Sequence, residues 1–340
     1  MKSLFITAPG KTEMREVARP EPGRGEVRVR VRYLGYCGSD LNTFRGLNPL
    51  VSYPRVPGHE LAGVIDAVGP DAADALVPGT QVLVVPYTSC GECSACRRGR
   101  SNACRNNQTL GVQRDGGLAE EVVVPVTKLL TSRQLSLREM VLVEPLSVGW
   151  HAARRGRAAA GDTVVVFGCG MVGLGAIASA AAAGSRVVAV DVDDGKLGIA
   201  RAAGAVVTIN SEADDLHQRL QTLTENRGPD LLIEGVGLPE TYRVCVEEAC
   251  FTGRVVYVGY AKQPVEYATK NFVMKELDIM GSRNATADDF RGVISYLELG
   301  RFPVDEVITH VVPFAEAGAA LDMWAKNPKT VTKIVVDLGI

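Results

Sequence analysis

The stretch 163–191 constrains the fold of this chain more than any other. An apolar run at 164–167 leads into the glycine pattern G-C-G-M-V-G, an alanine-rich segment follows, and a second apolar run ends in Asp191. Continuous apolar runs are typical of strands buried on both faces of a parallel sheet. Glycines at this spacing allow a tight turn, close approach of the backbone to a pyrophosphate and close helix packing, and the acid can accept hydrogen bonds from ribose hydroxyls. The stretch therefore predicts part of a doubly wound dinucleotide-binding (Rossmann) domain.

The acid that ends the second strand also indicates which dinucleotide binds. A carboxylate repels the 2′-phosphate of NADP, so Asp191 favours NAD as the cofactor. Further apolar runs at 205–209, 231–234, 254–259 and 277–281 extend the sheet. The residues that we assign to NAD binding are Gly168, Gly170, Met171, Val172, Gly173 and Asp191.

Residues 1 to about 130 contain many short strands separated by glycine and proline. The run 27–31 alternates apolar and charged residues, and the runs 61–68 and 121–124 are rich in β-branched side chains. This pattern predicts a compact, mostly-β, barrel-like domain. Because 340 residues exceed what one hydrophobic core usually serves, we expect two domains. The first is expected to comprise 1–147 and 288–340, and the second 148–287.

Four cysteines interrupt the first domain in a C-x2-C-x2-C-x7-C cluster, within a lobe that we place at 88–106. Four thiolates in so short a segment suit a closed tetrahedral zinc site that cross-links a lobe with little core of its own. An iron–sulfur cluster is the alternative, but ferredoxin patterns continue as x3-C-P, whereas here Arg105 follows the last cysteine. Unligated thiols are a third alternative. The zinc ligands predicted here are Cys90, Cys93, Cys96 and Cys104.

A second group of metal donors lies upstream, between 37 and 60. Cys37 begins the segment C-G-S-D, and His59 and Glu60 end the segment V-P-G-H-E. A thiolate, an imidazole and a carboxylate are the donors that a catalytic zinc takes when its fourth position stays open for water or substrate. Both segments contain turn-forming residues, which can direct the donors to one point. Each residue alone is more often an ordinary buried side chain than a ligand.

The net charge and the lengths of the apolar runs argue against several kinds of partner and location. The formal net charge of −2 argues against nucleic acid, which usually requires a basic face. The longest apolar stretch, 173–183, is too short to span a membrane, and the N-terminal apolar run is too short for a secretory signal. We therefore expect a cytoplasmic protein. In that reducing compartment the eight cysteines indicate metal binding or buried thiols before disulfides.

Taken together, these motifs resemble the zinc-dependent medium-chain alcohol dehydrogenase superfamily over essentially the whole chain. The resemblance implies an α/β protein with a GroES-like, mostly-β catalytic domain and a doubly wound Rossmann NAD-binding domain. Within the superfamily, C-G-S-D at 37–40 and E-P-L-S-V-G at 144–149 are similar to polyol (sorbitol) dehydrogenases. The segments 52–60 and 280–286 look closer to bacterial sugar-acid dehydrogenases, which oxidise C5 of L-galactonate, L-gulonate or similar aldonates.

The resemblance also implies roles for individual residues in catalysis. Cys37 and His59 would ligate the catalytic zinc, and Glu60 or Glu144 would complete the set directly or through a water. Ser39 matches the hydroxyl that relays the substrate proton, whereas Asn42 stands where many relatives carry a histidine and cannot carry a proton itself. Asp40 is expected to orient His59 by accepting its free ring N–H, with a turn-capping role as the alternative.

The candidates for substrate contact are less specific. Arg283 can bind the carboxylate of a sugar acid bidentately, although an ion pair with Asp278 would explain it equally well. Arg45, in the loop after the zinc cysteine, is a second candidate. By their positions in the family, Gln113, Arg114 and Leu118 are expected to lie near the substrate pocket, but their residue types do not decide a substrate. His151 is expected to be a core histidine with its hydrogen bonds satisfied rather than a ligand.

Three functions therefore stay open at this point. The first is NAD-dependent oxidation of a sugar acid, and the second is the same chemistry on a neutral polyol or on L-threonine. The third is a dinucleotide-binding protein without catalysis, against which the complete donor set argues. Relatives of this branch are commonly tetramers that dimerise through the edge of the Rossmann sheet, so the resemblance implies a homotetramer or homodimer.

Overall fold

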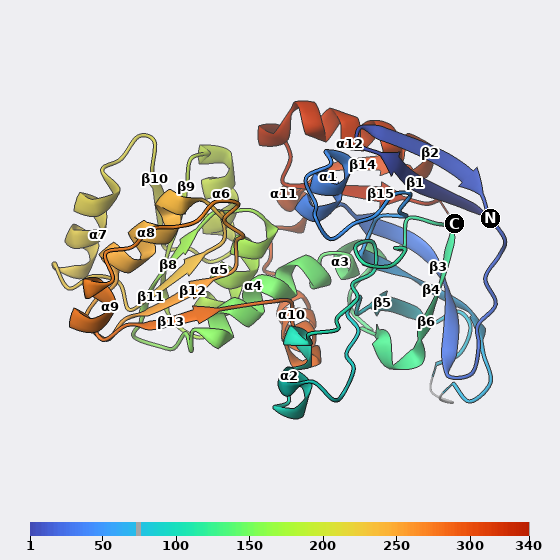
Figure 1. Cartoon of the computed structure of the whole chain (residues 1–340), viewed down its shortest axis with the longest axis horizontal. Coiled ribbons are helices and arrows are strands. Elements are labelled where there is room, and N and C mark those ends of the chain that lie inside the picture. Colours follow the sequence, from blue (N-terminus) through green and yellow to red (C-terminus); the bar gives the residue numbers. More distant parts are fainter. Residues whose placement is uncertain (73–75, 340) are drawn as a thin grey trace. The chain divides into compact units, whose positions relative to one another are not determined.

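The computed structural model describes residues 1–72 and 76–339 (Figure 1). It contains two compact units: unit 1 is Met1–Glu144 with Val304–Ile340, and unit 2 is Pro145–Pro303. Helix α4 (Val143–Arg155) begins in the first unit and continues into the second. No helix in the described part of the chain combines the length and the apolar character needed to cross a membrane.

Unit 1 is built around a seven-stranded sheet with the order β14-β15-β3-β4-β5-β7, and β6 pairs with β3. Val27, Val29 and Val31 of β3 are fully buried, as the alternation in the sequence predicts, whereas Arg28 between them is also buried and pairs with Asp66. A separate hairpin is formed by β1 (Lys2–Ala8) and β2 (Lys11–Glu16). The other strands are β3 (Glu26–Gly35), β4 (Glu60–Val68), β5 (Gln81–Val84), β6 (Glu121–Pro125), β7 (Leu129–Leu130), β14 (Ile308–Pro313) and β15 (Lys333–Asp337). The helices are α1 (Gly38–Phe44), α2 (Ser94–Arg97), α3 (Leu137–Met140), α11 (Val304–Val307) and α12 (Ala317–Lys326).

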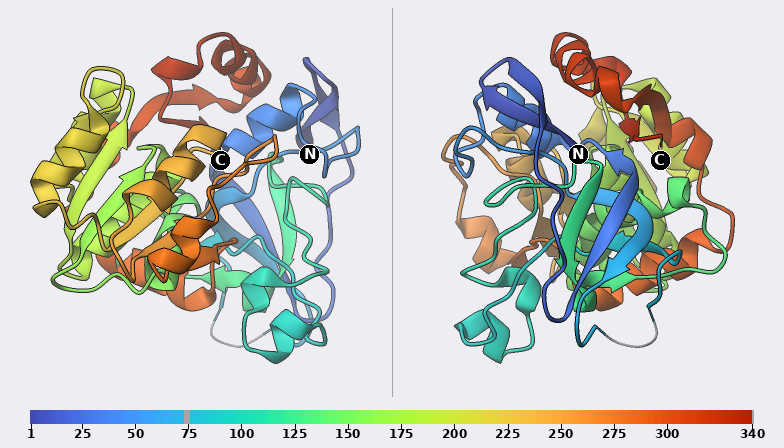
Figure 2. Two further views of the ribbon diagram at one scale, coloured as in Figure 1. Left: turned by 60° about the vertical axis from the view of Figure 1, so that its left-hand side comes forward. Right: turned by 90° about the vertical axis from the view of Figure 1, so that its right-hand side faces the viewer.

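Unit 2 contains a six-stranded parallel sheet with the order β10-β9-β8-β11-β12-β13. Figure 2 shows helices on both faces of this sheet, so the doubly wound fold predicted from the glycine pattern is confirmed. The strands are β8 (Thr163–Phe167), β9 (Arg186–Asp191), β10 (Val207–Asn210), β11 (Leu231–Glu234), β12 (Arg254–Tyr257) and β13 (Asp278–Gly281). The helices are α5 (Met171–Ala182), α6 (Asp194–Ala202), α7 (Leu216–Thr224), α8 (Pro239–Glu248), α9 (Lys270–Met274) and α10 (Ala287–Leu297).

The boundaries of the two units differ from those expected at 147 and 288. Unit 2 begins at Pro145 and continues through Pro303, so that it includes α10. The reason is a buried polar contact between α10 and α4. The fully buried Asp289 of α10 accepts hydrogen bonds from His151 Nδ1 at 2.8 Å and from Arg154 Nη1 at 2.7 Å. His151 is thus a histidine with a structural partner, as expected.

Candidate functional site

Asp40 connects the two segments that carry the first group of donors. One oxygen of its buried carboxylate accepts a hydrogen bond from the Cys37 backbone N–H at 2.9 Å. The other accepts one from the Gly58 N–H at 3.0 Å, directly before His59. Burial raises the pKa of this carboxyl group, while the charge of His59 and the two backbone hydrogen bonds lower it. The carboxylate therefore fixes the backbone on both sides of the site.

This arrangement favours the capping role that was the alternative for Asp40 over the expected contact with His59. The sequence placed its carboxylate on the free ring N–H of His59, but His59 Nδ1 is buried and has no hydrogen-bond partner. The oxygens of Asp40 are instead used by the two backbone donors. An acid three residues into a helix commonly caps the helix start, and here that capping contact extends to the second segment.

Cys37, His59 and Glu60 converge on one point in unit 1. One donor atom from each lies within 4.8 Å of the others. His59 and Glu60 are buried, and both His59 Nδ1 and Glu60 Oε1 lack a hydrogen-bond partner. Burial on its own lowers the pKa of His59. The charge of Cys37 and a hydrogen bond with Cys37 outweigh this effect, so the pKa of His59 lies well above its usual value. Buried donor atoms without a protein partner favour a bound cation, and a set of thiolate, imidazole and carboxylate fits zinc.

Glu60 also forms a buried ion pair that the sequence did not predict. Its Oε2 lies 2.5 Å from Lys333 Nζ, and both side chains are almost completely buried. Lys333 Nζ donates a second hydrogen bond to the Tyr36 carbonyl at 2.9 Å. A Cβ atom at Gly35 would lie 2.2 Å from Glu60 Oε2, so only glycine leaves room for this carboxylate. The ion pair therefore fixes one oxygen of Glu60 and leaves the other directed at no protein donor.

Glu144 lies beside this group but outside the set of donors that converge within 4.8 Å. The buried Tyr87 hydroxyl donates a hydrogen bond to Glu144 Oε1. Burial raises the pKa of Glu144 to about 7, with the charge of Glu60 adding to the shift and that of His59 opposing it. Tyr87 was not singled out by sequence reasoning. Ser39 Oγ is likewise buried without a hydrogen-bond partner, and its hydroxyl is free to bind another group.

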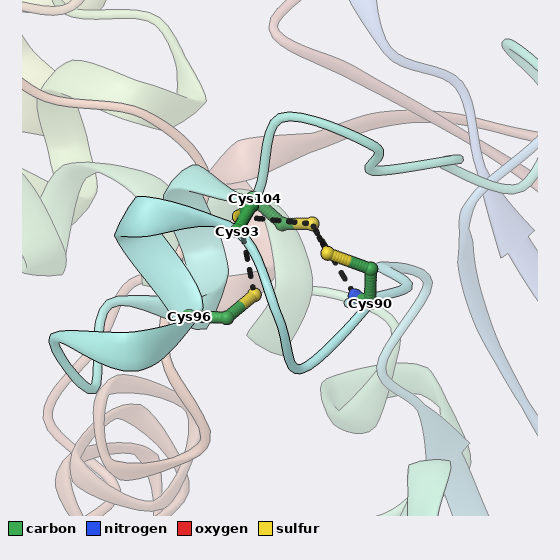
Figure 3. Close-up of side chains that lie close together, drawn as sticks. All are labelled: Cys90, Cys93, Cys96 and Cys104. Atoms are coloured by element: carbon green, nitrogen blue, oxygen red, sulfur yellow. Dashed lines mark hydrogen bonds between the residues drawn. The ribbon is translucent and has the colours of Figure 1, made fainter.

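The four cysteines of the lobe also lie together (Figure 3). The Sγ–Sγ distances are 3.5 Å for Cys93–Cys96, 3.9 Å for Cys93–Cys104 and 3.6 Å for Cys90–Cys104. Sulfurs held tetrahedrally about 2.3 Å from a zinc ion are separated by about 3.8 Å. Backbone N–H groups of Cys96 and Arg105 lower the pKa of Cys93 to about 6, which favours the thiolate form that binds metals. The geometry therefore fits a closed tetrahedral zinc site.

The glycine-rich turn of unit 2 joins the end of β8 to the start of α5. Gly168 has a φ of 87°, and a Cβ at Gly173 would lie 1.7 Å from the Gly168 carbonyl oxygen, so both positions require glycine. Asp191, at the end of β9, accepts hydrogen bonds from the Cys169 N–H at 2.7 Å and the Val192 N–H at 2.8 Å. The acid thus braces the turn, and the unpaired N–H groups at the start of α5 are suited to bind a phosphate.

The structure shows the surroundings of the three residues that the sequence predicts to contact the substrate. Arg283 lies half-buried in the segment after β13, while Asp278, the acid considered as its partner, pairs with Arg157. Arg45 donates from Nη2 to the Ala325 carbonyl at 2.5 Å. Gln113 Oε1 accepts a hydrogen bond from the Thr109 N–H at 2.8 Å. Their contacts with a substrate stay predictions.

Comparisons with known proteins agree with this geometry. Residues 23–134 match the alcohol dehydrogenase GroES-like domain, and residues 171–298 match the zinc-binding dehydrogenase family. L-galactonate-5-dehydrogenase of Escherichia coli K12 is 33% identical over 336 residues, covering 99% of this chain and 98% of the relative. Galactitol 1-phosphate 5-dehydrogenase of the same organism is 34% identical over 289 residues, covering 83% of each.

A solved structure extends the likeness to the whole chain. The crystal structure of the alcohol dehydrogenase RspB from Escherichia coli CFT073, complexed with NADH, has a TM-score of 0.92 and 33% sequence identity, covering 99% of both chains. The sequence and the fold of this chain thus match those of the solved structure along nearly the full length. The chain belongs to the zinc-type alcohol dehydrogenase family, whose members are oxidoreductases that act on CH–OH groups.

Proposed function

We propose that the chain oxidises a secondary alcohol of a sugar acid, at C5 of an aldonate, and transfers the hydride to NAD to give the keto acid. The observation that carries the proposal is the convergence of Cys37, His59 and Glu60 on one point. Two buried atoms of this group, His59 Nδ1 and Glu60 Oε1, have no protein partner. The same chain contains the glycine-rich turn that is suited to bind a dinucleotide. The names of L-galactonate-5-dehydrogenase and galactitol 1-phosphate 5-dehydrogenase support the position of oxidation, since both refer to the fifth carbon of a chain that carries an anionic group.

Cys37 and His59 hold the catalytic zinc, and Glu60 completes the set. Glu60 is favoured over Glu144 because its Oε1 is free of protein donors within the converging group, whereas Glu144 is bonded to Tyr87. When bound there, zinc supplies the Lewis-acid charge that favours loss of the alcohol proton near neutral pH. The lobe cysteines hold the second, structural zinc.

The remaining residues position groups and move the proton. Ser39 Oγ, which is buried and has no partner, accepts the hydrogen bond of the substrate hydroxyl and passes its proton outward. Asp40 positions Cys37 and His59 relative to each other, because its carboxylate accepts hydrogen bonds from the backbone N–H groups of Cys37 and Gly58. Asn42 cannot continue the relay, so the proton leaves through water, a cofactor ribose or a carboxylate. Asp191 binds the adenosine ribose, and the N-terminus of α5 binds the pyrophosphate.

The proposal is tested by the reduction of NAD with zinc-loaded protein. We expect kcat/KM for L-galactonate or L-gulonate to exceed that for galactitol, sorbitol, xylitol and L-threonine by at least about tenfold, because a paired carboxylate contributes more than about 1.4 kcal/mol. The measurement is NADH absorbance at fixed NAD. A neutral polyol or L-threonine as the best substrate would contradict the sugar-acid assignment and leave the zinc-dependent chemistry intact.

Selectivity for NAD gives a second prediction. We expect the wild-type protein to prefer NAD to NADP by at least about 100-fold, and Asp191→Asn to reduce that ratio by at least about tenfold, because the charge that repels the 2′-phosphate is lost. Asparagine can still offer its oxygen to the Cys169 N–H, which keeps that hydrogen bond to the turn, while the hydrogen bond from the Val192 N–H is lost. The ratio of kcat/KM for the two cofactors measures the effect. An unchanged ratio in a folded variant would remove Asp191 from the selectivity argument.

A further inference from the structure

Two cations in unit 1 are partly removed from water without an ion pair. Among the described side chains of that unit, every other arginine or lysine either is exposed or pairs with an acid, whereas Arg114 and Lys128 are half-buried and unpaired. Arg114 donates only one long hydrogen bond, from Nη2 to the Pro86 carbonyl at 3.4 Å, and its buried Nε has no partner. Burying a charge without a counter-ion is unfavourable, so this pair requires an explanation.

The two charges also act on each other. Burial lowers the pKa of Arg114, and burial together with the Arg114 charge lowers the pKa of Lys128. Both side chains belong to segments that contact the end of β5: Arg114 reaches Pro86, and the Lys128 carbonyl accepts the Val85 N–H at 2.8 Å. The nearby Asp115 pairs with Arg55 instead. An anion bound between Arg114 and Lys128 would therefore relieve both the repulsion and the loss of hydration.

Arg114 is anchored between the segments that carry the candidate metal site. Its loop packs against the residues before His59, since the Gly116 N–H bonds to the Val56 carbonyl at 2.8 Å and the Gly117 N–H bonds to the Gly58 carbonyl at 2.9 Å. On the other side, Pro86 directly precedes Tyr87, whose hydroxyl contacts Glu144. Within unit 1, the segment that carries Arg114 therefore contacts both the residues before His59 and the residue before Tyr87.

We infer that Arg114 and Lys128 form a receptor for the oxyanion, a carboxylate or a phosphate ester, at the end of the substrate remote from the oxidised hydroxyl. The inference rests on the proposed function and adds a cationic contact to those predicted for Arg283 and Arg45. The guanidinium of Arg114 can bind two oxygens at once, and the ammonium of Lys128 supplies a mobile point charge. This chemistry accommodates both a sugar acid and a sugar phosphate.

The test compares anionic and neutral substrates in matched variants. In Arg114→Gln and Lys128→Gln we expect KM for L-galactonate or galactitol 1-phosphate to rise by about 10- to 100-fold, with kcat within about threefold, because a charged hydrogen bond is lost in the bound state. KM for galactitol should stay within about twofold. Arg114→Lys should recover part of the loss. Arg133→Gln, which removes an exposed and unpaired arginine of the same unit, is the control and should change neither constant.

A purely structural role for the pair predicts a different result. Equal effects on anionic and neutral substrates, or an effect of Arg283→Ala alone, would overturn the inference. If the wild-type protein oxidises neither anionic substrate, the proposed function fails, and binding decides the inference separately. In that case inorganic phosphate should still raise the melting temperature of the wild-type protein and not that of the double variant Arg114→Gln/Lys128→Gln. Equal shifts in both proteins would exclude the receptor.

Discussion

Replacing Cys37 with serine is expected to remove one of about two zinc ions per chain and to lower kcat by at least about 1000-fold. The physical reason is the burial of the donor group. Cys37 is the thiol of a three-donor set in which His59 Nδ1 and Glu60 Oε1 have no protein partner, so its loss leaves two donors for the metal. Metal analysis of the purified protein and steady-state kinetics on the best substrate check the two parts of this prediction.

The lobe provides a matched comparison for this result. Cys93→Ser should also remove one zinc ion, but it should lower the melting temperature and leave kcat within about tenfold while the protein is folded, because a closed four-cysteine site contributes stability and not chemistry. Cys250→Ser, outside both clusters, is the control and should keep about two zinc ions. Retention of both metals and of kcat by Cys37→Ser would refute the catalytic site proposed here.

The parts that the sequence predicts well are those set by neighbours in the chain. The turn that ends at Gly173 joins two adjacent elements, so its glycines and Asp191 could be placed from pattern alone. Cys90 and Cys104 are separated by 14 positions, and a loop of that length brings the sulfurs together without the rest of the fold. The converging set of Cys37, His59 and Glu60 is also local, because it lies between positions 37 and 60.

What the sequence could not predict depends on contacts between distant segments. Lys333 lies 273 positions from Glu60 and reaches it only because β15 pairs with β3. From the sequence, a lysine that begins an apolar strand is expected to be exposed, and only its position in the assembled sheet buries it. The end of unit 2 was misplaced for a similar reason. An amphipathic segment such as α10 can pack on either domain, and the buried Asp289 decides the question through α4.

Loss of the Lys333 ammonium is expected to cause a large loss of stability. Lys333→Met should leave the Glu60 carboxylate buried without its counter-ion and lower the free energy of unfolding by about 3 to 5 kcal/mol in zinc-free protein. Urea unfolding in the presence of a chelator measures this loss. Lys326→Met is the control, since it breaks the exposed pair with Asp322 and should cost less than about 0.5 kcal/mol.

A second variant separates the ion pair from simple packing. If the penalty comes from an unpaired charge, the double variant Lys333→Met/Glu60→Gln should recover at least about 2 kcal/mol of stability while losing activity, because the charge is removed together with a proposed zinc ligand. Zinc should also reduce the penalty in Lys333→Met, since a bound cation compensates the same carboxylate. If the double variant is no more stable than Lys333→Met, with or without zinc, then Lys333 stabilises the sheet through packing and the link between Glu60 and the metal site is refuted.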